Sequence, residues 1–386
     1  MGDTIMPSII RATTTNGVQV APDNSGSLVL QTNGTTTALT IDTSQNATFA
    51  GTVSMGSSFL RNRIINGDMR IDQRNAGASV TPTNGQYTLD RWAFYVSQSS
   101  KLSTQQNAGS VTPPAGFTNY LGVTSSSAYS VVSGDFFLLS QAIEGFNVAD
   151  LAWGTANART VTLSFWVRSS LTGTFGGSIQ NQNQSRSYPF TYTISAANTW
   201  EQKSITITGD TSGTWLTNNG NGLWLFIGLG NGTTYSGTAG SWSGNNFTGA
   251  TGATSVVGTN GATFYITGVQ LEIGTTATPF ERRLYSQELA NCYRYYWQDP
   301  AVGLDTPYAD TTYNTVVKQY FMPANMRAMP TITQTGSIVA KNNIGTVNTF
   351  GTDAPTSNTN QTNIIIYATG TARTYLYRPV QFSAEL

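Results

Sequence analysis

Three aromatic side chains stand among Ser, Thr, Asn and Gly and have the residue types of a carbohydrate-binding site: Trp215, Trp242 and Tyr235. Sugars pack their C–H faces on aromatic rings, and neighbouring amides and hydroxyls bind the sugar oxygens. Asn218 and Asn245 supply such amides close in sequence. The pattern predicts these five residues as a carbohydrate-binding site, with packing in the core or against another subunit as the alternative for the two tryptophans.

The sequence restricts the catalytic chemistry available to the chain. It contains no His, which excludes Ser-His-Asp and Cys-His arrangements and imidazole zinc sites. A glycosidase with two carboxylates needs only Asp and Glu. However, Asp90 and Glu281 stand beside arginines and Glu272 ends a predicted strand, which favours ion pairs and turns. We therefore predict a protein that is not an enzyme and that uses no cofactor.

The charge balance argues against two classes of partner. Lys plus Arg and Asp plus Glu number 19 each, so no net field attracts nucleic acid or anionic lipid. The sequence shows no signal-peptide pattern and no run of about 18 apolar residues, so we expect neither secretion by a signal peptide nor a membrane span. Cys292 is the sole cysteine, which fits assembly in a reducing cytoplasm.

Composition and periodicity predict an all-β chain. Only 10% of the residues are charged, and Thr, Asn and 39 Gly suit short strands joined by turns. Residues 161–168 alternate apolar and polar, which predicts a strand with one buried face. Residues 222–229 are apolar on both faces, so this strand should be covered by the opposite sheet and by a neighbouring subunit or domain. Five of the other tryptophans are predicted to lie in the core: Trp92, Trp153, Trp166, Trp200 and Trp224.

The N-terminal segment, residues 1–60, is too short to bury a core of its own. Strands are predicted at residues 27–32, 37–43 and 47–53, with Leu28, Leu30, Leu39 and Ile41 on one face. A core shared by three chains would bury that face, whereas a flexible linker is the alternative.

Beyond residue 281 the pattern changes to a helix and then returns to strands. Helical spacing and a candidate N-cap at Ser286 predict a helix over residues 281–297, on which Cys292 is a small buried side chain. Strands are then predicted at residues 315–321, 331–335, 364–368 and 375–386. The polar residues 351–362 are predicted to form an exposed loop.

Several motifs, in one order over most of the chain, resemble a β-jelly-roll module found in bacteriophage tail fibres and receptor-binding proteins. Two further motifs near residues 323–330 and 382–386 resemble the ends of phage tail proteins. The jelly-roll motifs are Asn62-Arg-Ile-Ile-Asn-Gly-Asp-Met69, Tyr87-Thr-Leu-Asp-Arg-Trp92, residues 143–153, residues 161–168, Asn260-Gly-Ala-Thr-Phe-Tyr265, Tyr265-Ile-Thr-Gly-Val-Gln-Leu-Glu272 and Pro279-Phe-Glu-Arg-Arg283.

The resemblance implies an elongated, trimeric fibre subunit. Its expected parts are an N-terminal shaft and virion-attachment segment (1–60), a jelly-roll sandwich (61–281), a connecting helix (282–298) and a C-terminal β-sandwich tip domain (299–386). The N-terminus should dock to other virion proteins through Ile5, Ile9 and Ile10. The protein should assemble in the host cytoplasm, reside in the phage tail and bind host cell-surface polysaccharide.

Similar jelly rolls bind a structural calcium ion, and Asp68 lies in the corresponding opening motif. The acidic residue of their last strand is replaced here by Thr267-Gly268, so no metal site is predicted. Two functions remain open besides receptor binding. One is a structural adaptor or head-fibre protein without a receptor role, and the other is a depolymerase, which needs two carboxylates in one groove.

Overall fold

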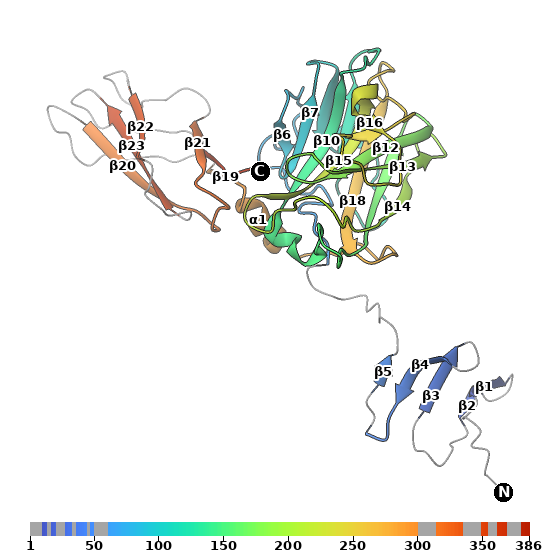
Figure 1. The fold of residues 1–386 in the computed structure, drawn as a ribbon. Helices are drawn as coiled ribbons and strands as arrows, with labels where there is room; N and C mark the ends of the chain where they lie inside the picture. The colour runs from blue at the N-terminus through green and yellow to red at the C-terminus, as the bar shows by residue number, and fades with distance from the viewer. Residues whose placement is uncertain are drawn as a thin grey trace, which may run out of the picture. The chain divides into compact units, whose positions relative to one another are not determined.

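The computed structural model describes ten stretches of the chain. Contacts divide the chain into two compact units, Met1–Phe59 and Leu60–Leu386. Within the described stretches, the fold is all-β apart from a single α-helix and short 3-10 turns (Figure 1). No helix there is long and apolar enough to cross a membrane. The described residues are 10–13, 17–20, 28–32, 36–44, 47–49, 61–299, 314–334, 349–353, 361–368 and 380–386.

The N-terminal unit contains a hairpin and a three-stranded antiparallel sheet of order β3-β4-β5. The register pairs Leu28 with Ile41 and Leu30 with Leu39, so these four side chains share one face, as predicted. The third strand ends at Phe49, and residues 50–53 of the predicted strand lie outside the described stretches. The strands are β1 (Ile10–Thr13), β2 (Gly17–Val20), β3 (Leu28–Thr32), β4 (Thr36–Ile41) and β5 (Ala47–Phe49).

A two-sheet sandwich dominates the second unit, consistent with a jelly roll (Figure 1). Both sheets are antiparallel, and successive strands cross repeatedly from one sheet to the other. The six-stranded sheet has the order β13 (Ser187–Ile194), β12 (Gly173–Gln180), β15 (Asn221–Asn231), β10 (Phe136–Glu144), β7 (Trp92–Val96) and β6 (Gln86–Leu89). The five-stranded sheet has the order β14 (Glu201–Ile207), β11 (Val161–Ser169), β18 (Thr263–Ile273), β9 (Leu121–Ser125) and β8 (Leu102–Gln106). A short parallel pair, β16 (Ser236–Gly237) and β17 (Gly249–Ala250), lies in the loops.

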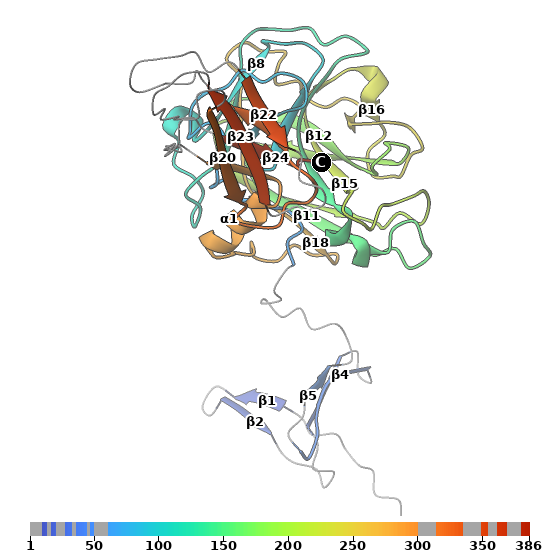
Figure 2. The ribbon, with the colours of Figure 1, turned by 90° about the vertical axis from the view of Figure 1, so that its left-hand side faces the viewer.

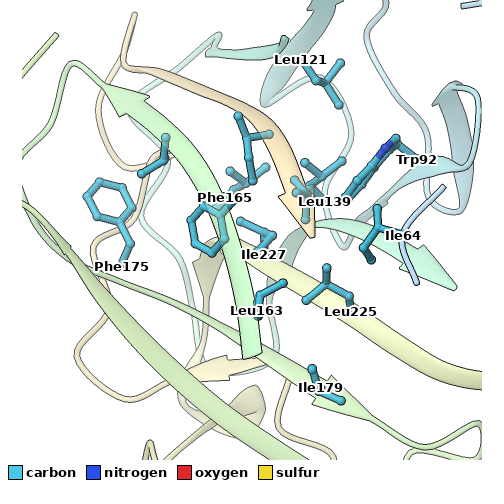
Figure 3. Close-up of a cluster of buried hydrophobic side chains, with 14 of the residues drawn as sticks. Ile64, Trp92, Leu121, Leu139, Leu163, Phe165, Phe175, Ile179, Leu225 and Ile227 are labelled. Atoms are coloured by element: carbon cyan, nitrogen blue, oxygen red, sulfur yellow. The ribbon is translucent and has the colours of Figure 1, made fainter. Parts of the chain in front are cut away.

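The core fills the space between the two sheets. Figure 3 shows Leu163 and Phe165 of β11 facing Leu225 and Ile227 of β15. The predicted alternation of β11 is confirmed, because Val161, Leu163, Phe165 and Val167 are fully buried. Its other face is partly wet: Thr162 and Ser164 are buried, whereas Trp166 and Arg168 are half-buried.

The opening and closing motifs meet directly, which explains why they occur together. The Arg63 amide donates to the Leu271 carbonyl at 2.9 Å, and the Val269 amide donates to the Gly67 carbonyl at 2.9 Å. The Asn62 side chain completes the junction through the Val269 carbonyl and the Leu271 amide. A Cβ at Gly67 would lie 2.2 Å from the Val269 oxygen, so this crossing requires glycine.

Helix α1 (Tyr285–Tyr293) is shorter than the predicted range and lies beside one end of the sandwich (Figure 2). The prediction of Ser286 as N-cap is wrong, because Leu284 holds that position without a side-chain cap. The helix does not reach Trp297, because Tyr296–Asp299 instead forms strand β19, which pairs with β24. Cys292 is buried among Ile65, Ile71 and Tyr295, as predicted.

The remaining strands form two three-stranded sheets, of orders β19-β24-β21 and β20-β23-β22. Residues 351–353 belong to β22 and residues 361–362 to β23, which corrects the prediction of a loop over 351–362, because their backbones pair with neighbouring strands. Residues 354–360 of that predicted loop lie outside the described stretches. The strands are β20 (Asn314–Phe321), β21 (Thr331–Gln334), β22 (Thr349–Asp353), β23 (Gln361–Ala368) and β24 (Val380–Ser383).

Residues after β24 are fixed to the sandwich by buried charges. The Glu385 carboxylate pairs with Arg74 at 2.5 Å and with the fully buried Arg91. Arg327 donates to the carbonyls of Ala384 and Glu385, each at 2.9 Å. Removing one member of such a buried pair costs about 3–5 kcal/mol, so Glu385 is a structural anchor of this end of the fold.

Candidate functional site

Trp215 and Trp242 are brought together by the fold, but around a third indole rather than in open solvent. Trp153 lies 4.7 Å from Trp215 and 5.3 Å from Trp242 between ring centroids, both edge to face. Trp215 and Trp242 are themselves 5.5 Å apart. We call these three residues the tryptophan cluster. All three pack against the sandwich core, which matches the packing alternative stated for the two loop tryptophans.

The indole N–H groups of the tryptophan cluster all donate hydrogen bonds to backbone carbonyls. The indole nitrogens of Trp153, Trp215 and Trp242 donate to carbonyls of Arg159, Ser212 and Thr208, at 2.7, 3.2 and 2.8 Å. A pocket of about 180 Å³ lies beside Trp153 and Trp215. Its other lining residues are apolar, except for Thr155 and Thr217. These contacts order the loops and leave few groups with which to bind a sugar.

The predicted amides, Asn218 and Asn245, are exposed, and neither lines the pocket beside Trp153 and Trp215. The Asn218 carboxamide oxygen accepts from the Gly220 amide at 2.8 Å and so closes a turn. Asn245 contributes its backbone carbonyl to the Ser187 hydroxyl at 2.6 Å. Among the predicted virion-attachment residues, Ile10 begins β1, whereas Ile5 and Ile9 lie outside the described stretches.

Tyr235 belongs to a different site, on the outer face of the six-stranded sheet. This outer aromatic pocket has a volume of about 200 Å³ and is open to solvent. Five of its nine lining residues are aromatic, and three carry neutral polar groups. The lining residues are Tyr95, Phe136, Leu138, Gln184, Trp224, Phe226, Tyr235, Asn246 and Thr248.

Strand alternation places the aromatic floor of the pocket. In β15 the residues Leu223, Leu225 and Ile227 enter the core, so Trp224 and Phe226 face outward. Their rings are stacked at 5.5 Å with an interplanar angle of 15°. Tyr95 of β7 meets the Trp224 ring edge to face at 5.7 Å.

The opposite wall comes from a strand end and a loop. Phe136 begins β10, and Tyr235 ends the 3-10 turn Thr233–Tyr235. Their rings are 5.3 Å apart and nearly perpendicular. Both side chains are half-buried, so one surface of each ring remains accessible.

The polar rim of the pocket consists of Gln184, Asn246 and Thr248, and a chain of hydrogen-bonded amides (the relay) orients the first two. Gln180 Nε2 donates to the Phe247 carbonyl at 2.7 Å and to Asn246 Oδ1 at 3.1 Å. Asn246 Nδ2 then donates to Gln184 Oε1 at 2.9 Å. A backbone carbonyl is only an acceptor, so it fixes the orientation of every amide in the relay. The Gln184 Nε2 group, at the end of the relay, donates to no described residue.

Nearby charges are neutralised or held away from the pocket. Arg186 forms a bidentate pair with Asp210 at 2.7 and 2.8 Å. Burial favours the neutral form of Asp135, beside Phe136, but hydrogen bonds from the Val132 amide and the Ser97 hydroxyl outweigh it and lower the pKa of this carboxyl. No lining residue of the outer aromatic pocket is charged.

The carboxylates predicted as structural do make structural contacts. Glu272 pairs with Arg61 at 3.6 Å, and Glu281 pairs with Arg283 at 3.9 Å. Asp90 accepts from the amide and side chain of Gln73, and burial raises the pKa of Asp90 to about 6.

Asp68, the residue considered for calcium, pairs with Arg70 at 3.2 Å, and burial raises the pKa of its carboxyl. The described stretches contain no group of three or more Asp, Glu, Cys or His side chains placed to bind a metal ion.

Sequence reasoning missed most of the outer aromatic pocket. Trp224 was predicted as core, but it is half-buried and lines this pocket, because its face of β15 is covered only in part by Tyr235, Asn246 and Thr248. The sequence feature that could have indicated this pocket is the strand at residues 222–229, which is apolar on both faces. We interpreted that pattern as a contact with another subunit or domain, whereas loops of the same chain provide part of the cover.

No protein-family model and no curated protein matches the chain. Similar solved structures include the enzymatically active domain of tailspike protein 4 of bacteriophage CBA120, with 13% identity and a TM-score of 0.31, covering 58% of this chain and 24% of that chain. The module TmCBM61 in complex with β-1,4-galactotriose has 10% identity and a TM-score of 0.28, covering 55% and 99%. A family 11 carbohydrate-binding module from Clostridium thermocellum, in complex with a mixed-linked tetrasaccharide, has 13% identity and a TM-score of 0.25, covering 52% and 97%. With such TM-scores, these similarities assign no function to this chain.

Proposed function

We propose that the chain is a non-catalytic phage tail-fibre subunit that attaches the virion to its host by binding cell-surface glycan in the outer aromatic pocket. The observation that carries this proposal is the pocket itself. It combines aromatic rings, which suit the C–H faces of sugars, with a rim of oriented amides and a hydroxyl, which suit sugar oxygens.

The lining of the pocket favours binding over cleavage. Glycoside hydrolysis needs two carboxyl groups flanking the scissile bond. None of the nine lining residues is Asp or Glu, and Asp135 is occupied by hydrogen bonds from Ser97, Tyr129 and Val132. A glycan in this pocket would therefore be held without being hydrolysed.

The N-terminal unit supports an assembled form. Leu28, Leu30, Leu39 and Ile41 share a face but are only half-buried within one chain, and Phe49 is 49% exposed. Three copies could bury these side chains together, which favours a homotrimer attached to the virion at this end. Light scattering on the native protein should give the mass of three chains, and a single-chain mass would contradict the trimer.

A structural adaptor or head-fibre protein is the second candidate. The same open aromatic face would also suit a contact with another virion protein, because aromatic residues are enriched in protein interfaces. Such a protein would bind virion components but not host cells.

Competition with phage adsorption tests the proposal. The purified, assembled protein should bind host cells and reduce adsorption, and Tyr235→Ala should weaken this effect at least tenfold without changing the oligomeric mass. Tyr285→Ala is a matched control, because Tyr285 is 55% exposed and lies outside the pocket. A protein that neither binds nor competes, or a Tyr235→Ala variant that competes fully, would refute attachment through this pocket.

A further inference from the structure

The type of sugar that fits the outer aromatic pocket can be inferred from its chemistry, and this inference rests on the proposed function. Anionic sugars are disfavoured first. A carboxylate that enters a site without a cation loses hydration and gains no ion pair. No Lys or Arg lines the pocket, and Arg186, close in sequence to Gln184, is already paired with Asp210.

The size of the pocket limits how much of a glycan can enter. Binding pockets for drug-sized ligands are about 300–1,000 Å³. A volume of about 200 Å³ suits a single sugar unit, either at a chain end or on a branch. The rest of the glycan would lie outside the pocket.

Apolar surface is present on two sides of the pocket. Trp224 presents the accessible surface of the floor, with the buried Phe226 stacked against it, and Phe136 presents the accessible surface on β10, beside the buried Leu138. A plain hexose has apolar C–H faces but is ringed by hydroxyls, which would be desolvated against a second apolar wall. A ligand with a methyl group beside the ring uses that wall better.

The polar rim has two hydrogen-bond donors that no described residue uses. The relay through Gln180 and Asn246 occupies Gln184 Oε1, which leaves the Gln184 NH₂ group to donate. Thr248 Oγ1 accepts from Asn231 Nδ2 at 2.7 Å, which leaves its proton to donate. The free groups of the rim therefore match a carbonyl or other acceptor oxygen on the ligand.

Gln184 adopts a backbone conformation that has an energetic cost. Its φ is 59°, in the left-handed region that Gly and Asn adopt more readily. Strained residues of this kind concentrate at functional sites. Here the conformation places the Gln184 side chain at the pocket.

We infer that the outer aromatic pocket binds one uncharged sugar unit that carries an acetamido group. The sugar ring lies on the accessible face of Trp224. The acetamido carbonyl accepts a hydrogen bond from Gln184 Nε2, and the acetamido methyl group packs against Phe136.

Binding of simple methyl glycosides to the full-length protein tests this inference, with saturation-transfer NMR as the readout. The panel consists of N-acetylglucosaminide, N-acetylgalactosaminide, glucoside, galactoside and glucuronide. At least one acetamido sugar should bind tenfold or more tightly than its plain counterpart and the glucuronide, which corresponds to about 1.4 kcal/mol.

Gln184→Glu keeps an oxygen for Asn246 Nδ2 but replaces the free donor with an acceptor, so the acetamido preference should disappear. Gln182→Glu is the control, because it places the same charge on an exposed residue of the same loop and should keep the preference. Equal binding of plain and acetamido sugars, preferred binding of the glucuronide, no binding of any sugar in the panel, or an unchanged preference in Gln184→Glu would overturn the inference. Attachment itself would then still stand if the wild-type protein competes with adsorption and Tyr235→Ala does not.

Discussion

The outer aromatic pocket and the tryptophan cluster contain similar residues, yet their polar atoms are used differently. In the tryptophan cluster every indole N–H donates to a backbone carbonyl. In the pocket, the buried N–H of Trp224 has no partner among the described residues, and the Gln184 amide retains a free donor. Buried groups without partners are costly, so natural structures keep few of them. Unused hydrogen-bonding capacity, rather than aromatic content, therefore distinguishes the candidate binding site from the structural cluster.

Replacing the central residue of the tryptophan cluster should have the largest effect on stability. Trp153 is 7% exposed and touches both partner indoles, so Trp153→Ala should lower the free energy of unfolding by about 3–5 kcal/mol. Urea denaturation measures this loss. The folded fraction should still bind glycan, and selective loss of binding without loss of stability would reverse the roles assigned to the two regions.

Replacing the floor of the outer aromatic pocket should affect binding more than folding. Trp224→Ala removes the stacking surface, and we expect glycan binding to weaken at least tenfold, about 1.4 kcal/mol. Because Trp224 is half-buried, its loss should destabilise the protein less than Trp153→Ala does. Titration calorimetry with the purified glycan and urea denaturation of the same sample give both quantities. Intact binding by Trp224→Ala would exclude this pocket as the site.

Replacing the exposed Asn245 side chain should have a small effect. Its contact with Ser187 uses the backbone carbonyl, which Asn245→Ala retains. Stability should stay within about 0.5 kcal/mol of wild type, as for most surface changes. Glycan binding, measured in the same titration, should also be unchanged. A clear loss of binding would indicate that the glycan binds at the loop predicted from the sequence and not in the outer aromatic pocket.

Glycan binding should be nearly independent of pH between about 5 and 8. No lining residue is Asp, Glu, Lys or Arg, and burial raises the pKa of Tyr95 above its ordinary value. Asp135 has a lowered pKa, so its charged form stabilises the fold above the ordinary Asp pKa, and this contribution is lost as the pH falls through its folded pKa. Repeating the titration across this range checks the prediction, and a bell-shaped profile would indicate a titrating group in the site.

The sequence predicted individual strands well because their signals are local. Alternation along β11 of the sandwich identified a buried face, and alternation in the N-terminal unit identified the face that β3 and β4 share. The outer aromatic pocket was not predictable in the same way. Its lining residues come from β7, β10, β15 and three loops, and no single segment of the sequence shows which strands pair or which loops cover the sheet. Tyr296–Asp299 shows the same limit, since helical spacing was overridden by pairing with β24, far along the chain.

The pairing of β24 also has a consequence for how this chain could vary. Gln334 at the end of β21 and Val380 at the start of β24 are direct partners across the ladder, although 45 residues separate them in the sequence. Closing a loop costs little more as the loop lengthens, about 0.6 kcal/mol for each doubling. Related chains could therefore differ in the length of the segment between β21 and β24 while keeping the pairing of these two strands and the sandwich unchanged.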